Sequence, residues 1–293
     1  MIRNTAIFRS LLGLLSFFNR RHHLVAASRL RNVRSSLLFL ILLFAIPAQA
    51  AQTDIAGPAG SGRFGSAVTV LPNGNFVVND SFYSIPGGAA NVGAVYLYDA
   101  TTLKIISTLT GSAANDRVGS GITVLTNGNY VVSSIEWHIV GAVTWCSATT
   151  GCSGVVSANN SLIGGTAYDG VGDGGIKVLA NGNYLVNSPD WDNPAGAKAD
   201  AGAVTCGNGT GGTVGLVTSS NSLIGGSAND QVGRGITVLT NGNYVVSSPF
   251  WDNPTGPTVD VGAVTWGNGS GGTVGLISAS NSLIGGRAND TDY

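Results

Sequence analysis

A block of fourteen residues that occurs twice limits what this chain can fold into. Gly-Ile-Thr-Val-Leu-Thr-Asn-Gly-Asn-Tyr-Val-Val-Ser-Ser occupies residues 121–134 and again 235–248, and related blocks occupy residues 67–80 and 175–188. A unit this small cannot bury an apolar face alone, so successive copies must stack on one another to form a core. The chain is therefore predicted to be a repeat protein.

An Asn-Gly-Asn triplet marks each copy and sets the repeat boundaries. The triplets begin at Asn73, Asn127, Asn181 and Asn241, so by subtraction they are 54, 54 and 60 residues apart. We expect four repeats and the start of a fifth. Their predicted boundaries are residues 51–110, 111–164, 165–224 and 225–284, followed by a truncated repeat at residues 285–293.

Each copy contains short runs of β-branched residues separated by Gly, Asn or Pro. In repeat 2 these runs lie at residues 122–125, 130–133, 142–145 and 155–157. Asn-Gly between two such runs predicts a hairpin, because both residues tolerate the positive φ angles of a type I′ turn. No segment after residue 50 has apolar residues at helical spacing. We therefore predict an all-β fold with a four-stranded antiparallel sheet in each repeat.

Repeats of this length with four strands match the blades of a β-propeller better than the shorter coils of a β-helix. The predicted fold is a β-propeller-like array of about four blades. The alternative is a β-solenoid, because stacked coils or a row of sandwich-like modules would show the same short strands and turns.

The first repeat resembles an FG-GAP repeat of the kind found in integrin α-chain propellers. The resemblance rests on Arg-Phe-Gly-Ser-Ala-Val-Thr-Val-Leu-Pro-Asn-Gly-Asn-Phe-Val-Val at residues 63–78 and Gly-Ala-Val-Tyr-Leu-Tyr at residues 93–98. It extends over residues 57–284, although the Phe-Gly pair becomes Val-Gly in the later repeats. Those repeats are also similar to bacterial surface-protein repeats that contain Thr-Asn-Gly-Asn-Tyr-Val-Val-Ser-Ser-Pro and Gly-Ala-Val-Thr-Trp-Gly-Asn-Gly.

This resemblance implies an incomplete propeller. FG-GAP propellers commonly have about seven blades, more than the four repeats counted here. An open end would expose unpaired strands and an apolar face, so further repeats or self-association are expected. Many FG-GAP units also carry an Asp-rich calcium loop, but the matching positions hold Leu-Pro-Asn-Gly-Asn or Leu-Thr-Asn-Gly-Asn, so that calcium site does not carry over.

The first fifty residues have the composition of a secretory signal peptide. They contain seven of the fourteen basic residues and no acidic residue, and an apolar run at residues 37–46 precedes Pro-Ala-Gln-Ala. We predict a signal peptide at residues 1–50, so that the mature protein is secreted or displayed on the cell surface without inserting in the membrane. The alternative is a retained hairpin anchor made of residues 7–18 and 37–46, but both stretches are short for a membrane span.

Removal of this leader changes the charge of the protein. Seven basic and fifteen acidic residues remain, which leaves about eight net negative charges by subtraction. The acidic residues are spread singly among loops, and no basic stripe could neutralise phosphates. Nucleic acid is therefore not an expected partner.

Two of the three cysteines flank one predicted hairpin loop. Cys146 and Cys152 would lie close enough across such a loop to form a disulfide in an oxidising compartment. The alternative is a pair of free thiols at strand ends. Cys206 occupies the position of Trp145 and Trp266 in its repeat and is expected to be a packing residue.

Two similar loops supply the candidate metal ligands. Each begins with Trp-Asp-Asn-Pro, and its acidic and amide side chains together with backbone carbonyls would form a weak calcium site. The alternative is that these side chains bond their own backbone in turns. The candidate ligands are Asp192, Asn193 and Asp200 in one loop and Asp252, Asn253 and Asp260 in the other.

Little in the mature chain supports catalysis. Its one histidine, His138, and its one glutamate, Glu136, lie in the same Ile-Glu-Trp-His segment and occur in no other repeat. They would act as an acid/base pair or form a simple ion pair, and no nucleophile accompanies them. The protein is therefore not expected to be an enzyme, and no cofactor other than calcium is considered.

These observations favour a non-catalytic binding or adhesion module outside the cell. An extracellular glycan or protein is the expected partner, with recognition placed in the Trp-Asp-Asn-Pro loops because binding residues are usually on loops of a rigid frame. Two alternatives remain. The repeats would be structural stalk or spacer units of a larger exported protein, or accessory blades of an exported enzyme.

Overall fold

The computed structural model describes residues 52–256 and 258–288, and nearly all of its regular structure is β-strand. The predicted signal peptide and most of the predicted fifth repeat lie outside these residues. One short 3₁₀ turn, η1 (Trp137–Ile139), is the only helical element in the described part of the chain. No helix within that part is long and apolar enough to cross a membrane. The all-β prediction is confirmed.

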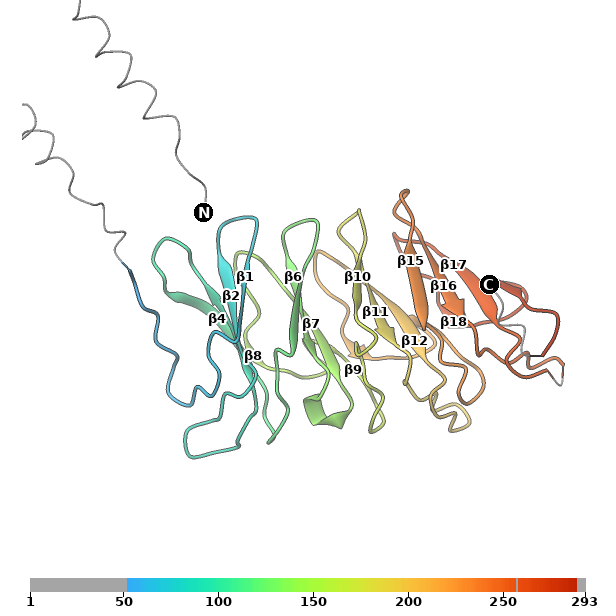
Figure 1. The fold of residues 1–293 in the computed structure, drawn as a ribbon, viewed down its shortest axis with the longest axis horizontal. Coiled ribbons are helices and arrows are strands. Elements are labelled where there is room, and N and C mark those ends of the chain that lie inside the picture. Colours follow the sequence, from blue (N-terminus) through green and yellow to red (C-terminus); the bar gives the residue numbers. More distant parts are fainter. Residues whose placement is uncertain (1–51, 257, 289–293) are drawn as a thin grey trace, which may run out of the picture. The chain divides into compact units, whose positions relative to one another are not determined.

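The strands form four sheets, one for each repeat (Figure 1). The first contains β1 (Ala67–Val70), β2 (Phe76–Asp80), β3 (Ala94–Tyr98), β4 (Ile105–Thr110) and β8 (Gly154–Val155). The second contains β5 (Gly121–Val124), β6 (Tyr130–Ser134), β7 (Ala142–Cys146), β9 (Leu162–Ile163) and β13 (Gly215–Leu216). The third contains β10 (Ile176–Val178), β11 (Tyr184–Ser188), β12 (Ala203–Gly207), β14 (Ser222–Ile224) and β18 (Gly275–Leu276). The fourth contains β15 (Gly235–Val238), β16 (Tyr244–Ser248), β17 (Ala263–Gly267) and β19 (Ser282–Ile284).

The Asn-Gly-Asn triplets form the first hairpin of every repeat, but not with the predicted turn. The Leu71 carbonyl accepts a hydrogen bond from Gly74 N at 2.9 Å, and Leu71 N donates to the Asn75 carbonyl at 2.8 Å. Gly74 has a φ of 93°, whereas Asn73 does not have a positive φ. The type I′ prediction is therefore wrong, because the chain uses a three-residue loop in which only the glycine is left-handed.

A short strand passes from each repeat to the sheet before it. β8, β13 and β18 follow the third strand of repeats 2, 3 and 4, and they pair in parallel with β4, β9 and β14 of the preceding sheets. These three ladders of two residue pairs are the parallel ones, and the other ladders of the described residues are antiparallel. The fourth strand predicted at residues 155–157 thus completes the neighbouring sheet, while β9 completes its own sheet.

Neighbouring sheets pack face to face and share one apolar core at each junction. Between repeats 1 and 2, Leu97 and Leu109 are grouped with Tyr130 and Val132. Equivalent residues form a second core between repeats 2 and 3 and a third between repeats 3 and 4. Each repeat therefore buries its apolar surface on its neighbours, as expected for a stacked repeat.

The Asn-Gly-Asn side chains fasten each repeat to the next. The Nδ2 atoms of Asn127 and Asn129 both donate to the Gly209 carbonyl of the following repeat, at 2.7 and 3.1 Å. We call this pair of hydrogen bonds the Asn clamp. The same clamp joins Asn73 and Asn75 to Ala148, and Asn181 and Asn183 to Gly269.

The two ends of the array are not joined within residues 52–256 and 258–288. No strand of the fourth sheet pairs with a strand of the first in that part of the chain. The structure is therefore an array of four sheets with four or five strands each, without propeller closure among the described residues.

Candidate functional site

The aromatic residues that follow the second strand of each repeat are packing residues. Trp137, Trp191 and Trp251 are buried, and each belongs to a core between two repeats. The Trp-Asp-Asn-Pro loops therefore direct their tryptophans inward and do not present them to a ligand.

The predicted calcium ligands make hydrogen bonds inside their own loops. Asp192 Oδ1 accepts from Asp200 N, and Asp252 Oδ1 accepts from Asp260 N, both at 2.9 Å. Asn193 Oδ1 accepts from the backbone two residues later. Asn253 does the same. In the part of the chain that the structure describes, no three His, Cys, Asp or Glu side chains are grouped so that they could hold a metal ion.

A second acidic column, Asp116, Asp169 and Asp230, fixes the loop before the first strand of repeats 2, 3 and 4. Asp230 accepts backbone N–H groups from Gly226 and Ser227 at 2.8 Å and from Asp252 at 2.9 Å. Burial raises the pKa of Asp230 to about 6, despite these donors. These carboxylates therefore brace the loops by accepting hydrogen bonds from backbone N–H groups.

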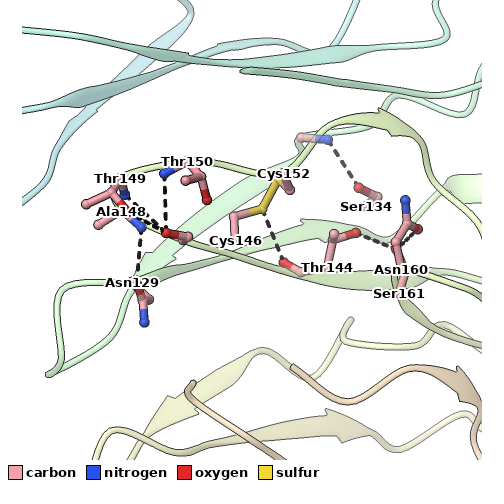
Figure 2. The surroundings of a disulfide bond; sticks show 12 residues. Asn129, Ser134, Thr144, Cys146, Ala148, Thr149, Thr150, Cys152, Asn160 and Ser161 are labelled. Carbon is pink, nitrogen blue, oxygen red and sulfur yellow. Dashed lines mark hydrogen bonds between the residues drawn. A yellow bond between two sulfur atoms is a disulfide. The ribbon is translucent and has the colours of Figure 1, made fainter. Parts of the chain in front are cut away.

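A disulfide joins Cys146 and Cys152 across a hairpin loop (Figure 2). The loop carries Ala148, whose N–H donates to Asn129 Oδ1 at 3.1 Å and whose carbonyl is the acceptor of the first Asn clamp. Cys206 is a free, half-buried thiol. Burial raises the pKa of the Cys206 thiol to about 11, so it stays protonated and unreactive at neutral pH.

Glu136 and His138 do not face each other. The Glu136 carboxylate pairs with Arg117 Nη1 at 2.9 Å, whereas His138 Nε2 lies 3.1 Å from Ser112 Oγ and 3.7 Å from Asp116 Oδ2. The two residues considered as an acid/base pair therefore have separate partners.

A cavity of about 480 Å³ lies between the loops of repeats 2 and 3. It opens where repeat 2 lacks a long loop. Three residues separate Trp137 from Gly141, whereas ten separate Trp191 from Gly202 and ten separate Trp251 from Gly262. Its lining comes from repeat 2 (Asn115, Ile135, Glu136, Ile139) and repeat 3 (Tyr168, Gly170, Asp173, Asp190).

Two exposed side chains of this cavity stand on strained backbone. Tyr168 is 79% exposed with a φ of 72°, and Ile139 is 57% exposed with a φ of 58°. Asn115 and Asn229 hold the position of Tyr168 in repeats 2 and 4, and Asn adopts this left-handed conformation more readily than a bulky residue. Such strain persists where the surrounding structure imposes it, often at functional sites.

Asp173 and Asp190 form an acidic pair on one wall of the cavity. Partial desolvation, the negative charge of Asp190 and a hydrogen bond between the two carboxyl groups together raise the pKa of Asp173 to about 6. Repeat 4 has Arg234 and Phe250 at these positions, with the guanidinium 5.1 Å from the ring centre. A proton shared by the two carboxyl groups would let the pair both donate and accept hydrogen bonds.

Sequence reasoning missed this cavity because it treated the four repeats as copies of one unit. The signals were departures from the repeat, namely the short loop after Trp137, a tyrosine in a column of asparagines, and an acidic pair in place of arginine and phenylalanine. The cavity brings together none of the predicted calcium ligands.

Comparison with known proteins identifies the repeat. A search among curated proteins finds no match to the chain. A family described as a repeat of unknown function (DUF5650) matches residues 70–120, 124–173, 178–234 and 238–291, which together make up more than half of the chain. The protein therefore belongs to the DUF5650 repeat family, with four copies of the repeat.

Proposed function

We propose that this protein is a non-catalytic, secreted or cell-surface repeat protein that binds an extracellular glycan in the cavity between repeats 2 and 3. The observation that carries the proposal is the cavity itself, which combines an exposed aromatic ring, exposed aliphatic groups and a pair of carboxyl groups. Ligand sites commonly combine an apolar wall with a few placed polar groups.

A neutral sugar fits this chemistry. The ring of Tyr168 offers a flat apolar surface for the C–H face of a sugar. The Asp173 and Asp190 pair would accept hydrogen bonds from neighbouring hydroxyl groups, and below about pH 6 its shared proton would donate one in return. Glu136, the other carboxylate of the cavity, is already paired with Arg117, so the cavity does not demand a strongly cationic ligand.

Export is part of the proposal. It is supported by the composition of residues 1–50 and by the Cys146–Cys152 disulfide, because disulfides persist in oxidising compartments. The non-catalytic assignment is supported by the separate partners of Glu136 and His138.

The proposal also retains a propeller-like architecture related to FG-GAP repeats. Antiparallel sheets that face one another in sequence order support it, as do the strands of the following repeat that complete the first three sheets. In such an array the binding cavity would lie where loops of two neighbouring blades meet.

The test is binding of the chain from residue 51 onward to an array of immobilised neutral glycans, followed by titration of any glycan retained. Tyr168→Asn restores the residue that repeats 2 and 4 carry and relieves the backbone strain. We expect this variant to be at least as stable as the parent and to bind at least about tenfold more weakly, through loss of the ring contact.

Asn229→Ala is the matched control, because it changes the same position at the junction of repeats 3 and 4, away from the cavity. It should leave glycan binding unchanged. Equal binding by the parent and Tyr168→Asn would reject the cavity as the ligand site. A lysine-rich protein is immobilised beside the glycans as a second probe. If the chain bound this protein and no glycan, the proposed ligand class would be wrong.

A second candidate function is a structural spacer without a ligand of its own. The Asn clamps and three short strands favour it. The strands β8, β13 and β18 each join the sheet of the preceding repeat, and we call them the exchanged strands. Clamps and exchanged strands link every repeat to the next irrespective of any cavity. It predicts no saturable binding on the glycan array and no loss of stability in the Tyr168→Asn variant.

A further inference from the structure

The fourth sheet lacks the strand that completes each sheet before it. β4, β9 and β14 each pair on their outer side with a two-residue strand from the following repeat. β19 holds the same place in repeat 4, and within residues 52–256 and 258–288 it pairs only with β17. Its outer edge therefore offers backbone groups for one more parallel strand.

The apolar residues beside this edge are exposed in repeat 4 and buried elsewhere. Leu283 is 79% exposed, whereas its equivalents Leu109, Leu162 and Leu223 are buried in the three cores. Trp266 is 54% exposed. A groove of about 390 Å³ runs over this surface, and its apolar lining includes Val245, Val264, Trp266 and Leu283.

The donors of an Asn clamp are also present on this surface. Asn241 and Asn243 use their Oδ1 atoms within repeat 4, as their equivalents do. Their Nδ2 atoms have no acceptor among the described residues, whereas the three preceding pairs each bind a carbonyl of the next repeat. Trp266 matches Trp145, whose Nε1 donates to the clamped carbonyl of Gly209 at 2.9 Å.

We propose that this surface is a docking site for a further repeat unit of the same type. We call it the open face of repeat 4, made of Asn241, Asn243, Val245, Val264, Trp266 and Leu283. The partner supplies a loop carbonyl to the Asn clamp, a two-residue Gly-Leu or Gly-Val strand to the edge of β19, and a tyrosine and valine strand to the apolar groove.

A second copy of the folded chain does not offer this partner. Its strands β8, β13 and β18 already complete its own sheets, and repeat 1 has no equivalent strand, because β4 follows a short turn after β3. The outer face of repeat 1 is also covered. Phe64 lies 5.8 Å from Tyr96 and 6.3 Å from Tyr98 between ring centres, and Ile55 packs on the same cluster.

The test uses the chain from residue 51 onward and the same chain extended after Asp290 by a second copy of residues 231–286, which continues the repeat in register. Leu283→Cys reports on the open face through its rate of alkylation. We expect the extension to slow alkylation of this thiol at least about tenfold. Leu223→Cys, in the buried equivalent position of repeat 3, should react slowly in both chains and so report that the original repeats remain folded.

Two outcomes would overturn the proposal. One is rapid alkylation of Leu283→Cys in the extended chain while Leu223→Cys stays protected. The other comes from light scattering of the chain without extension, which we expect to be monomeric. A dimer that Leu283→Lys dissociates would show that a second copy covers the open face.

Discussion

The asparagines of the Asn-Gly-Asn triplet have two roles that the structure separates. Their Oδ1 atoms stabilise the turn of their own repeat, and their Nδ2 atoms bind the following repeat. Because repeat 4 keeps the first role and lacks the second in the described residues, the chain contains its own control for the clamp.

Asn127→Ala should destabilise the protein more than Asn241→Ala. The first change removes the bond from Asn129 N at 3.1 Å and the bond to Gly209 at 2.7 Å, whereas the second removes only the bond from Asn243 N. We expect a difference in unfolding free energy of about 1 kcal/mol, the usual net contribution of one hydrogen bond. Urea denaturation of both variants measures it, and equal midpoints would mean that the clamp adds no stability.

The acidic pair of the cavity predicts a pH-dependent stability. Desolvation and Asp190 raise the pKa of Asp173 to about 6, so the stabilising effect of its proton is fully present below about pH 4 and is lost as the pH rises through 6. Asp173→Asn should flatten this slope between pH 4 and 7. The effect should be about 1 kcal/mol, because solvent screens this exposed group.

Thermal unfolding followed from pH 4 to 7 measures this effect. Asp99→Asn serves as a control without a slope in this range, because hydrogen bonds from Thr102 lower the pKa of Asp99, and its contribution is lost only as the pH falls below about 4. An unchanged slope in Asp173→Asn would show that the Asp173 and Asp190 pair does not titrate in this range.

At the scale of elements, each exchanged strand is followed by one buried side chain, which packs into the core between the two repeats that the strand connects. Val156, Val217 and Ile277 follow β8, β13 and β18, and each is buried in a core that belongs to the preceding junction. Backbone pairing over two residues is short, so this side chain carries much of the attachment.

Val217→Ala should therefore loosen the junction of repeats 2 and 3. Val217 is almost fully buried, and its truncation should lower the unfolding free energy by about 1–3 kcal/mol through lost packing. Leu216→Ala, in β13 itself, changes a half-exposed side chain and should stay within about 0.5 kcal/mol. Hydrogen exchange at Leu162 and Ile163, the partners of β13, reports whether the loosening is local.

The elements that the sequence predicted are those with a local signal. Predicted runs at residues 122–125, 130–133 and 142–145 agree with β5, β6 and β7 to within one residue, because β-branched runs and Asn-Gly turns act over short distances. The pairing of β8, β13 and β18 was not predictable in this way. A two-residue strand has no periodicity, and its partner is chosen by packing against another repeat.

The shared repeat motif did not predict the cavity either. It depends on seven residues missing from one loop and on a tyrosine in a left-handed conformation, and neither is visible in the shared motif. Comparing the repeats by their differences would have pointed to it, because binding sites on repeat proteins sit where loops vary on a fixed frame.

At the scale of the whole molecule, the described array has two unlike ends. Aromatic residues that occur only in repeat 1 cover its outer face, as in a capping repeat, whereas the open face of repeat 4 is uncovered in the described residues. Among residues 52–256 and 258–288, the cores and clamps link each repeat only to its neighbours, so stability should be the sum of repeat and junction contributions.

This arrangement predicts that damage stays near the repeat that receives it. Val246→Ala removes a fully buried side chain from the core between repeats 3 and 4 and should speed hydrogen exchange in β14, β16, β17 and β19. Exchange in β1 to β4 should not change, because no side chain of repeat 1 reaches that core. Val132→Ala, in the core between repeats 1 and 2, should give the converse pattern. Faster exchange in all four sheets of either variant would contradict this prediction. It would mean that the repeats unfold as one cooperative unit, whose stability cannot be divided into contributions of single repeats and junctions.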